Sequence, residues 1–474
     1  MDLDDIRCLA VLGLRRSGRP AALLARRRLP AARVVALDEG DPPEDAAAEL
    51  RATGVEVLLG EAAVLPPEVD LLVKSPGVPN ESHAVQEALR RGVTLWSEVE
   101  FAARFLENRV IGITGTNGKT TTTELIGAIF RDAGLPVAVG GNVGHALAGL
   151  PDAVSAEATV VAELSSFQLE HIERFRPDVG VLLNLTEDHL DRHGDYRGYV
   201  DAKLRIFANQ VEEDVALLNA DDPGTLFEAV AGRLAGRGRR AWLSATPGRQ
   251  AGPSGESLAA GVDADHLLWL DFEGERVGLC PAGELALKGD HNRQNSLAAA
   301  AAACALGVPA DAAADTLRSF AGVPHRLQVA GVAGGVTYVN DSKATNVDAT
   351  LKALTAYSVG VYLILGGYDK GAEYDALAAA TEGLVKEALL IGATAPQLEA
   401  AFAARGAAAG SRATPYVVCG DLEAAVLLAA REVSPGDVVL LSPACASWDQ
   451  YRDYVERGEH FLKLVSDLRG VGPS

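Results

Sequence analysis

Short apolar runs alternate with amphipathic helical patterns in the first part of the chain. Three runs of strand length and two helical patterns occur there: Cys8–Leu12, Val34–Leu37 and Leu71–Val73 for strands, Ala21–Arg27 and His83–Arg91 for helices. Strands that alternate with helices are typical of a parallel sheet covered by helices. We therefore predict a Rossmann-like α/β domain over residues 1–97.

The same alternation returns toward the end of the chain. Five apolar runs of strand length occur there: Val336–Asn340, Val361–Leu365, Ala388–Ile391, Tyr416–Cys419 and Val438–Leu441. Polar clusters follow three of these runs, at 340–346, 366–371 and 442–449. Ligands of open α/β sheets bind at the carboxyl ends of strands. We predict a second Rossmann-like domain over residues 323–474, with a ligand crevice at those strand ends.

The stretch between these two domains contains the most specific pattern in the chain. The apolar run Val110–Ile113 breaks into TGTNGKTT, residues 114–121, and a helical pattern follows. A strand, a glycine loop, Gly-Lys-Thr and a helix form a loop whose backbone N–H groups bind phosphates. Lys119 would then reach the β- and γ-phosphates, and the Thr120 hydroxyl would hold Mg²⁺. The strict motif has glycine where this chain has Ile113.

Two neighbouring predicted strands also end in polar side chains. Thr159–Ala162 is followed by Glu163, and Val179–Leu183 leads into NLTEDHLDRH, which contains His189. A carboxylate at a strand end beside a phosphate loop is a candidate metal ligand, and its alternative is a helix cap. His189 is interpreted as a site residue because it follows a third polar strand end of one sheet.

Other features of the central region are less specific. Lys203 lies in a helical pattern, Tyr199–Phe207, and its apolar neighbours indicate a partly buried face, but the residues alone assign it no role. Asn292 and Asn295 precede the alanine-rich helix predicted at Ser296–Leu306, where they would either cap the helix or present amides to a purine. The segment Gln250–Gly261 is rich in Gly, Pro and Ser and is predicted to be a mobile loop.

Composition and length narrow the class of protein. A chain of 474 residues predicts about three domains, which we place at 1–97, 98–322 and 323–474. The net charge of −21 argues against a surface that coats nucleic acid. The five cysteines are widely spaced and form no CxxC pair, which favours reduced thiols over disulfides or a zinc site. No signal peptide or membrane span is predicted, so we expect a cytoplasmic protein.

The turn after the first strand is similar to a dinucleotide-binding fingerprint. It reads GLRRSG over residues 13–18, but Arg15 occupies the position of the middle glycine. A bulky side chain there opposes the close approach of a pyrophosphate. Binding of a dinucleotide is therefore disfavoured, whereas a nucleotide-sugar site at this turn and a domain that binds nothing both stay open. A further turn at Ser75–Pro79 is too common to decide between them.

The motifs taken together resemble the Mur ligase family over essentially the whole chain. They follow one another in the order GTNGKTTT, ELSSFQLE, NLTEDHLDRH, DHNRQN, PHRL, NDSKATN, GGYDK and SPACASWDQY. Several are most similar to the branch of the family that adds D-glutamate. The central motifs are shared with folylpolyglutamate synthase, which is the alternative. A catalytically inactive nucleotide-binding protein is disfavoured because Lys119, Glu163, His189 and Lys203 are all present.

The resemblance implies three α/β domains, of which the central one is a P-loop ATPase type, and an ATP-dependent amide ligase. ATP would phosphorylate a carboxylate of UDP-N-acetylmuramoyl-L-alanine, and the amine of D-glutamate would attack the acyl phosphate. Two Mg²⁺ ions are implied, held by Thr120, Glu163, His189 and a carbamylated Lys203. A carbamate offers anionic oxygens to Mg²⁺, whereas a free ammonium would be repelled. The resemblance further implies a cytoplasmic enzyme of peptidoglycan synthesis, which we expect to be a monomer without a nucleic-acid or membrane partner.

The resemblance also implies roles for individual residues. Those expected to bind ATP are Gly115, Thr116, Asn117, Gly118, Lys119, Thr120, Thr121, Asn292, Asn295, Arg326 and Asp341. Those expected to bind the nucleotide-sugar substrate are Ser17, Asp38, Ser75, Gly77, Asn142 and Ser165. Those expected to bind D-glutamate are Thr345, Lys370, Ser447 and Tyr454. His325 is expected to help position the transferring group.

The chain departs from the family pattern at two places. The family usually reads GLGxSG where this chain reads GLRRSG over residues 13–18, so Arg15 replaces a glycine. We hypothesise that Arg15 or Arg16 contacts the diphosphate. Tyr454 stands where phenylalanine is common, which is a mild change.

Overall fold

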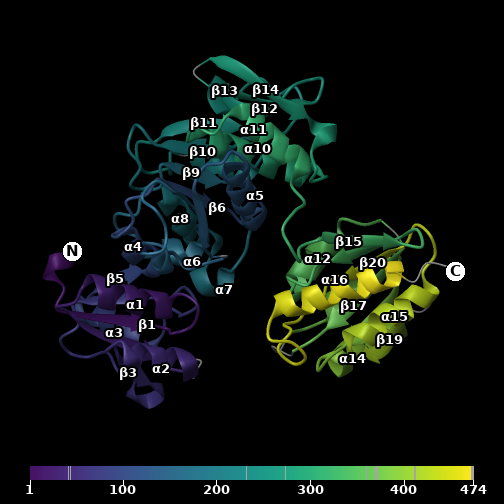
Figure 1. Ribbon diagram of the computed structural model, residues 1–474, viewed down its shortest axis with the longest axis horizontal. Helices are drawn as coiled ribbons and strands as arrows, with labels where there is room; N and C mark the ends of the chain where they lie inside the picture. Colours follow the sequence, from purple (N-terminus) through teal and green to yellow (C-terminus); the bar gives the residue numbers. More distant parts are fainter. Residues whose placement is uncertain are drawn as a thin grey trace. The chain divides into compact units, whose positions relative to one another are not determined.

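The computed structural model contains two compact units, the first from Met1 to Phe320 and the second beginning at Ala321 (Figure 1). It describes residues 1–40, 42, 44–142, 144–230, 232–272, 274–358, 360–368, 372–409 and 413–470. The first unit contains two sheets and the second unit contains one. The domain boundaries after residues 97 and 322 stay predictions.

The first sheet of unit 1 is fully parallel, with strand order β3-β2-β1-β4-β5. Its strands are β1 (Cys8–Leu12), β2 (Arg33–Asp38), β3 (Glu56–Leu59), β4 (Leu71–Lys74) and β5 (Thr94–Ser97). Its helices are α1 (Gly18–Arg28), α2 (Glu44–Ala52) and α3 (His83–Arg91), and α4 (Glu98–Ala103) follows. Because β1 lies between β2 and β4, all five of its residues are buried.

The second sheet of unit 1 has nine strands in the order β14-β13-β12-β11-β10-β9-β6-β8-β7. The strands are β6 (Val110–Thr114), β7 (Val137–Gly141), β8 (Thr159–Glu163), β9 (Val179–Leu182), β10 (Val215–Asn219), β11 (Arg239–Leu243), β12 (Leu258–Val262), β13 (Leu267–Phe272) and β14 (Glu275–Pro281). Only the β12–β13–β14 pairings are antiparallel. The parallel neighbours β8, β6 and β9 therefore end at one edge of the sheet.

Helices surround this second sheet. They are α5 (Lys119–Asp132), α6 (Ser166–Leu169), α7 (Leu190–His193), α8 (Tyr196–Leu204), α9 (Pro223–Val230), α10 (Asp290–Ala305) and α11 (Ala310–Ser319). The apolar faces of α5, α10 and α11 share one buried cluster with the sheet, which includes Ile126, Phe130 and the alanines of α10. This packing fixes the starts of α5 and α10 relative to the strand ends.

Unit 2 contains a six-stranded sheet with order β15-β16-β20-β17-β18-β19. Its strands are β15 (Gln328–Ala333), β16 (Val336–Asn340), β17 (Val361–Gly366), β18 (Val385–Ile391), β19 (Tyr416–Gly420) and β20 (Val438–Leu441). Its helices are α12 (Val347–Leu354), α13 (Asp375–Ala380), α14 (Ala395–Ala409), α15 (Leu422–Glu432) and α16 (Tyr454–Gly470). Only β15 is antiparallel to its neighbour.

The predicted α/β class with largely parallel sheets is confirmed, and two local predictions are wrong. The segment Gln250–Gly261 was predicted to be a mobile loop, but β12 begins at Leu258 and pairs with β11 and β13. The alanine helix was predicted to begin at Ser296, but α10 begins at Asp290. Its first turns carry polar side chains, so apolar spacing did not reveal them.

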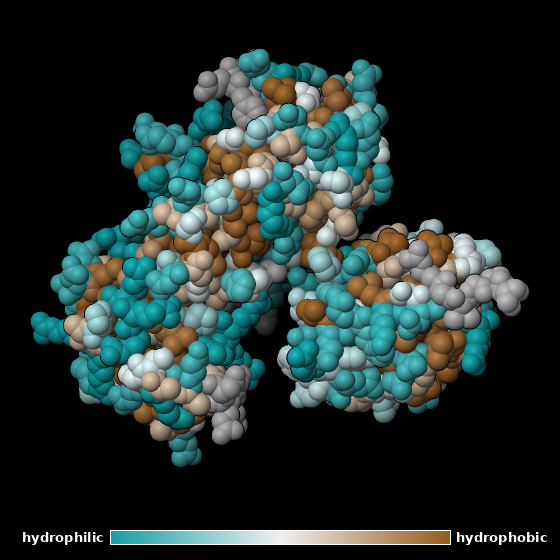
Figure 2. Space-filling model, viewed as in Figure 1, coloured by the Kyte–Doolittle hydropathy of each residue, from teal (hydrophilic) through white to brown (hydrophobic). Residues whose placement is uncertain are grey.

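Within the part of the chain that the structure describes, no helix combines the length and apolarity needed to cross a membrane. On the face drawn in Figure 2, hydrophilic residues are interspersed with smaller apolar patches in both units.

Candidate active site

The glycine loop lies between β6 and α5 in the central sheet. Gly115 and Gly118 have φ angles of 146° and 83°, in the region that favours glycine. A Cβ added to Gly118 would lie 2.3 Å from Oδ1 of Asn295. The loop therefore needs glycine at this position both for its backbone conformation and for the close approach of α10.

Residues after β9 hold the loop in place. The backbone N–H of Asn117 donates to Oδ1 of Asn184 at 2.8 Å, and Nδ2 of Asn184 donates back to the Asn117 carbonyl at 3.1 Å. Thr116 Oγ1 donates to the Thr186 carbonyl at 3.1 Å and lies 2.9 Å from the Tyr199 hydroxyl. Asn184 and Tyr199 were not predicted as site residues, and their spacing in the sequence carries no signal for this role.

Two lysines converge on the loop. Nζ of Lys119 donates to the carbonyls of Gly115 and Thr116 at 2.8 and 2.9 Å, and Nζ of Lys203 donates to the same Gly115 carbonyl at 2.8 Å. Lys203 is only 2% exposed. Burial, reinforced by the charge of Lys119, holds the pKa of Lys203 well below its usual value. The amine of Lys203 therefore has an increased neutral fraction, which makes it more nucleophilic toward a small electrophile.

Glu163 ends β8 beside these lysines, and its charge acts on Lys203. The side chain is 2% exposed, and Oε1 accepts a hydrogen bond from Nδ2 of Asn142 at 2.9 Å. Oε2 is buried and has no hydrogen-bond partner in the described chain. An unsatisfied buried carboxylate oxygen is costly, and a cation would satisfy it.

The residues around Glu163 fit a magnesium ion. Thr120 lies in the first turn of α5 and is 6% exposed, so a hydroxyl is available beside the loop. No group of three or more His, Cys, Asp or Glu suited to a metal occurs among the residues that the structure describes. Oxygens from substrate phosphates, or from a modified lysine, would complete the shell that Mg²⁺ prefers.

His189 adopts a positive φ of 53°, which is uncommon for a residue with a side chain. Its side chain is 50% exposed, and its ring meets the edge of Phe167 with centroids 5.0 Å apart. Phe167 is stacked in turn on His193, and the Arg192 guanidinium lies 4.6 Å from its ring centre. The aromatic contact covers one side of His189, and its Nε2 lies 3.6 Å from Oδ2 of Asp188. Phe167 and His193 lie inside predicted motifs but were not assigned roles.

The start of α10 lies against the phosphate loop. Asn295 packs on Gly118, and Nδ2 of Asn295 lies 3.3 Å from Oδ1 of Asn292. Nδ2 of Asn292 donates to the Lys288 carbonyl at 2.8 Å. Both asparagines lie within the helix, so neither is an N-cap, and they share a helical face beside the loop. Thr121 lies half-buried in the first turn of α5.

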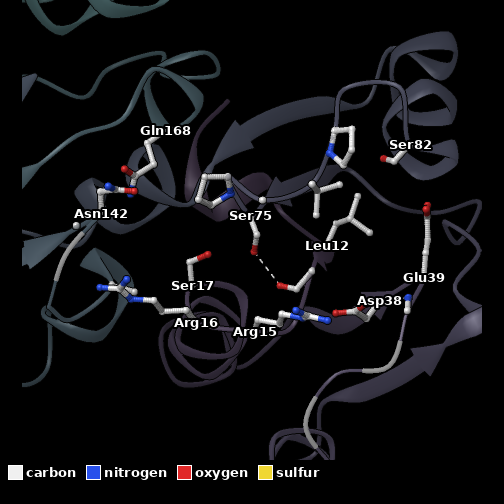
Figure 3. A pocket seen from close by; sticks show the side chains of 18 residues that line it. Leu12, Arg15, Arg16, Ser17, Asp38, Glu39, Ser75, Ser82, Asn142 and Gln168 are labelled. Atoms are coloured by element: carbon white, nitrogen blue, oxygen red, sulfur yellow. Dashed lines mark hydrogen bonds between the residues drawn. The ribbon is translucent and has the colours of Figure 1, made fainter. Parts of the chain in front are cut away.

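A pocket of about 440 Å³ opens at the carboxyl ends of the first sheet (Figure 3). Five of the six residues predicted to bind the nucleotide sugar line it: Ser17, Asp38, Ser75, Gly77 and Asn142. Four of them come from the turns of the first sheet, and Asn142 follows β7 of the second sheet. The sixth, Ser165, does not line the pocket but forms a capping box with Gln168, which does.

The turn after β1 shapes this pocket. Gly13 has a φ of 86°, and a Cβ on Gly18 would lie 1.7 Å from the Gly13 carbonyl oxygen. Oγ of Ser75 donates to the same carbonyl at 2.8 Å, as drawn in Figure 3. Asp38 accepts from the backbone N–H of Leu14 at 2.8 Å. The hydroxyl of Ser75 and one oxygen of Asp38 thus hold the turn.

The two arginines of this turn point in different directions. Figure 3 shows Arg15 extended toward Asp38 within the pocket. Arg16 reaches the other way, and its guanidinium donates to the Gly144 carbonyl at 2.8 Å. Arg15 is therefore the arginine with its charge directed into the pocket, whereas Arg16 joins the turn to the loop after β7.

Unit 2 contains six of the remaining predicted residues, and Lys370 lies outside the described residues. His325 is 4% exposed with a φ of 61°, and its Nδ1 accepts from Nδ2 of Asn340 at 3.0 Å. Burial raises the pKa of Asp341 to about 6, and its two oxygens accept from Leu327 N–H and Ser442 Oγ. The charge of the adjacent Arg326 acts on that carboxyl.

Arg457 connects the loops that carry the predicted amino-acid residues of unit 2. It is 1% exposed and donates to the Ser342 carbonyl and to the carbonyls of Cys445 and Ala446. Thr345 and Ser447 lie just beyond these anchors, and Tyr454 begins the same helix as Arg457. No sequence pattern indicated this role for Arg457, because a lone arginine in a helix is usually solvated.

The central and C-terminal parts of the chain match two family models. Residues 113–303 match the Mur ligase middle domain, and residues 325–445 match the glutamate ligase domain of Mur ligases. A curated UDP-N-acetylmuramoylalanine–D-glutamate ligase of Pelotomaculum thermopropionicum is 41% identical over 97% of both chains. A ligase of the same name from Solibacter usitatus is 42% identical over 99% of both chains. The chain belongs to the Mur ligase family.

Solved Mur ligases agree with this fold. A UDP-N-acetylmuramate–alanine ligase of Thermotoga maritima matches 97% of this chain and 99% of its own with a TM-score of 0.54. MurF of Acinetobacter baumannii matches 98% of this chain and 93% of its own with a TM-score of 0.57. Both are 18% identical to this Mur ligase, so they bear on its architecture alone.

Proposed function

We propose that this Mur ligase joins D-glutamate to UDP-N-acetylmuramoyl-L-alanine, at the expense of ATP, in cytoplasmic peptidoglycan precursor synthesis. The names of relatives that are 41–42% identical over nearly the whole chain support this substrate pair. We further propose that the enzyme acts as a monomer, with domain boundaries after residues 97 and 322.

One observation carries the proposal: a chain of three side chains, Asn142, Glu163 and Lys203, connects the pocket to the phosphate loop. Asn142 lines the pocket and hydrogen-bonds to Glu163, whose charge acts on the Lys203 that donates to the loop. A carboxylate carried by a ligand of the pocket would therefore be close to the phosphates bound by the loop. A ligase that activates a carboxylate with ATP requires this proximity.

The chemistry follows from the poor reactivity of a carboxylate, whose leaving group would be oxide. A carboxylate oxygen of the substrate attacks the γ-phosphorus of ATP, the bond to the bridging oxygen breaks, and ADP leaves. The amine of D-glutamate then attacks the acyl carbon, loses a proton, and expels inorganic phosphate as the amide forms. Lys119 and the N–H groups of the loop stabilise the charge that develops on the transferring phosphoryl group.

We propose that two Mg²⁺ ions bind beside the loop, held by Thr120, Glu163, His189 and Lys203. They would neutralise charge on the β- and γ-phosphates. Lys203 would contribute as a carbamate: its neutral amine attacks the carbon of CO₂ and a proton is lost, which leaves two oxygens that share one negative charge. The lowered pKa of Lys203 supports this step, because only the neutral amine has the required electron pair.

The other substrates have proposed contacts in both units. Asn292 and Asn295 would bind the purine side of ATP, and Arg326 and Asp341 would bind its γ-phosphate and ribose. Thr345, Lys370, Ser447 and Tyr454 would bind D-glutamate, with Lys370 pairing a carboxylate. His325 is buried and hydrogen-bonded to Asn340, which supports a positioning role for it.

The decisive experiment is phosphate release from ATP with the amino acid varied. We expect release only when UDP-N-acetylmuramoyl-L-alanine and D-glutamate are both present, and not with L-glutamate, L-alanine or meso-diaminopimelate. Release that requires a folate and L-glutamate instead would replace this proposal by the folylpolyglutamate synthase alternative.

The carbamate has a separate test. Protein equilibrated with ¹³C-bicarbonate should give a carbamate carbon signal in NMR that is lost in Lys203→Arg. A spectrum without that signal in the wild type would exclude the modification, whatever the activity.

A further inference from the structure

The side chain of Asn142 contacts Glu163, a candidate metal ligand, and also lines the pocket. Nδ2 donates to Oε1 of Glu163 at 2.9 Å, and the backbone N–H of Asn142 donates to the Glu163 carbonyl at 2.8 Å. Two hydrogen bonds to one residue fix the asparagine closely. Its Oδ1 has no hydrogen-bond partner in the described part of the chain, although Asn142 lines the pocket.

The local backbone is built for this contact. In the parallel pairing of β7 and β8, Gly141 lies opposite Glu163. Gly141 has a φ of 98°, and a Cβ there would lie 2.2 Å from the Glu163 carbonyl oxygen. Only glycine lets the chain pass this close, so the turn at Gly141 delivers Asn142 to the end of β8.

The contact also determines which oxygen of Glu163 is available. Oε1 is occupied by the amide of Asn142, whereas Oε2 is buried and unpartnered. A cation that meets Glu163 would therefore bind through Oε2, with the carboxylate plane held by Asn142. Groups that orient a metal ligand in this way typically change metal affinity by about 10- to 100-fold when they are removed.

We propose that Asn142 is a positioning residue that couples occupancy of the nucleotide-sugar pocket to metal binding at Glu163. The Oδ1 atom accepts a hydrogen bond from a secondary amide N–H of the bound substrate, and this contact holds the asparagine on Glu163. The inference rests on the proposed function, because it assumes a substrate with amide groups and a metal at Glu163. By linkage, the pocket ligand must tighten metal binding by the same factor by which metal tightens ligand binding.

The test measures binding without turnover. Mn²⁺ would be titrated against the protein in the presence of the non-hydrolysable ATP analogue AMP-PNP, and free Mn²⁺ would be followed by electron paramagnetic resonance. The titration would be repeated with saturating UDP-N-acetylmuramoyl-L-alanine and with saturating UDP, which lacks the N-acetyl and L-alanyl amides of the full substrate. We expect the amide-bearing ligand to tighten Mn²⁺ binding about fivefold, a typical coupling strength. UDP should leave Mn²⁺ binding nearly unchanged.

The variants are Asn142→Ala and Asn142→Ser, each of which keeps the backbone N–H that donates to Glu163. We expect both to weaken Mn²⁺ binding about tenfold and to abolish the difference between the two ligands. Asn209→Ala is the matched control, since Asn209 donates only to the Phe175 carbonyl in the same unit. It should keep the wild-type coupling, and thermal unfolding would establish that all variants are folded.

The outcomes separate this inference from the proposed function. Asn142 variants that retain the wild-type coupling factor, or a wild type in which UDP tightens Mn²⁺ as much as the full substrate, would overturn the inference. A wild type to which UDP-N-acetylmuramoyl-L-alanine does not bind by calorimetry would overturn the proposed function instead.

Discussion

Two glycine turns of unit 1 follow the same strand–turn–helix pattern and yet form different surroundings. The turn after β1 borders an open pocket of about 440 Å³, into which Arg15 extends. The turn after β6 is crowded by polar side chains of other elements, among them Asn184, Tyr199 and Asn295. One turn leaves room for a ligand, and the other is held tightly by the protein.

The difference agrees with the ligand proposed for each turn. A large nucleotide-sugar ligand needs a volume, and its recognition groups can lie on several turns around that volume. A triphosphate needs a concentrated and fixed set of N–H groups and positive charge, and such a set must be oriented before the ligand arrives. The first turn is held by the hydroxyl of Ser75 and the carboxylate of Asp38 at the edge of the pocket, and the second by buried charges and hydrogen bonds from several elements.

The largest expected effect concerns the charge on the crowded turn. Lys119→Ala removes the cation that donates to two loop carbonyls, and we expect kcat to fall about 10³-fold, as for the loss of a group that stabilises the transition state. Binding of the nucleotide sugar, measured by calorimetry, should change little because Lys119 does not line the pocket. Full activity of this variant would contradict the proposed role of Lys119 in binding the phosphates.

The second effect is on stability and involves Glu98, a buried carboxyl on which the charge of Arg16 from the first turn acts. Its Oε1 accepts from the Ala148 N–H, and burial raises the pKa of Glu98 from 4.5 to about 7. The folded state therefore favours the neutral acid, and stability is lost as the pH rises from 4.5 through 7. This loss amounts to about 3 kcal/mol.

Glu98→Gln tests this dependence because it keeps the acceptor oxygen and cannot ionise. We expect the variant to gain unfolding free energy relative to the wild type at pH 8 and to gain little at pH 5. Urea unfolding at both pH values provides the measurement. Equal differences at the two pH values would show that Glu98 does not ionise within this range.

The third effect compares the glycines themselves. In Gly18→Ala the new Cβ would meet the backbone oxygen of Gly13 at 1.7 Å, and in Gly118→Ala it would meet the movable end of the Asn295 side chain at 2.3 Å. We expect Gly18→Ala to cost about 3 kcal/mol of stability through overpacking. Gly118→Ala should cost about 1 kcal/mol because its φ is positive. Thermal unfolding measures both.

Substrate kinetics should separate the same two variants. Gly18→Ala should raise KM for the nucleotide sugar, whereas Gly118→Ala should raise KM for ATP. If Gly18→Ala raised KM for ATP and Gly118→Ala raised KM for the nucleotide sugar, the two turns would not bind the ligands proposed for them.

The smallest effect concerns the two arginines of the first turn. Arg15→Ala should raise KM for the nucleotide sugar about tenfold, as expected for losing one charged contact to a diphosphate. The increase in KM should be smaller at high salt, because salt screens the contact. Arg16→Ala should have a smaller effect, because that guanidinium is already bound to the Gly144 carbonyl. Unchanged KM values in both variants would contradict a diphosphate contact for either arginine.

Apolar periodicity predicted the strand–helix alternation well. Runs such as Cys8–Leu12 and Val361–Leu365 are buried on both sides, so their composition reports their position directly. The start of α10 was missed because Asp290–Gln294 are polar, and β12 was missed because glycine and proline precede it. The spacing of apolar residues indicates which positions are buried, and neither segment has a clear apolar spacing.

The site was predicted only in part, for a related reason. Lys119 begins the helix after the glycine loop and Glu163 ends a neighbouring strand, both in motifs with a known mechanism, so their types and spacing were informative. Asn184, Tyr199 and Arg457 act on loops that are distant in the sequence, and no spacing predicts such contacts. The resemblance to a family assigned a role to Lys203, whereas its apolar neighbours alone predicted a partly buried face and no role. Its nearly complete burial follows from the packing of α8 against the loop.

The alanine-rich helix α10 limits which substitutions its buried face can accept. Leu297 and the residues from Ala298 to Cys304 are all buried against the central sheet and α5, and most have the smallest side chain that a helix favours. A larger residue at these positions would push α10 away from α5 and withdraw Asn295 from Gly118. The helix thus acts as a spacer of fixed thickness, and the close approach of Asn295 to the phosphate loop depends on small side chains in the core behind it.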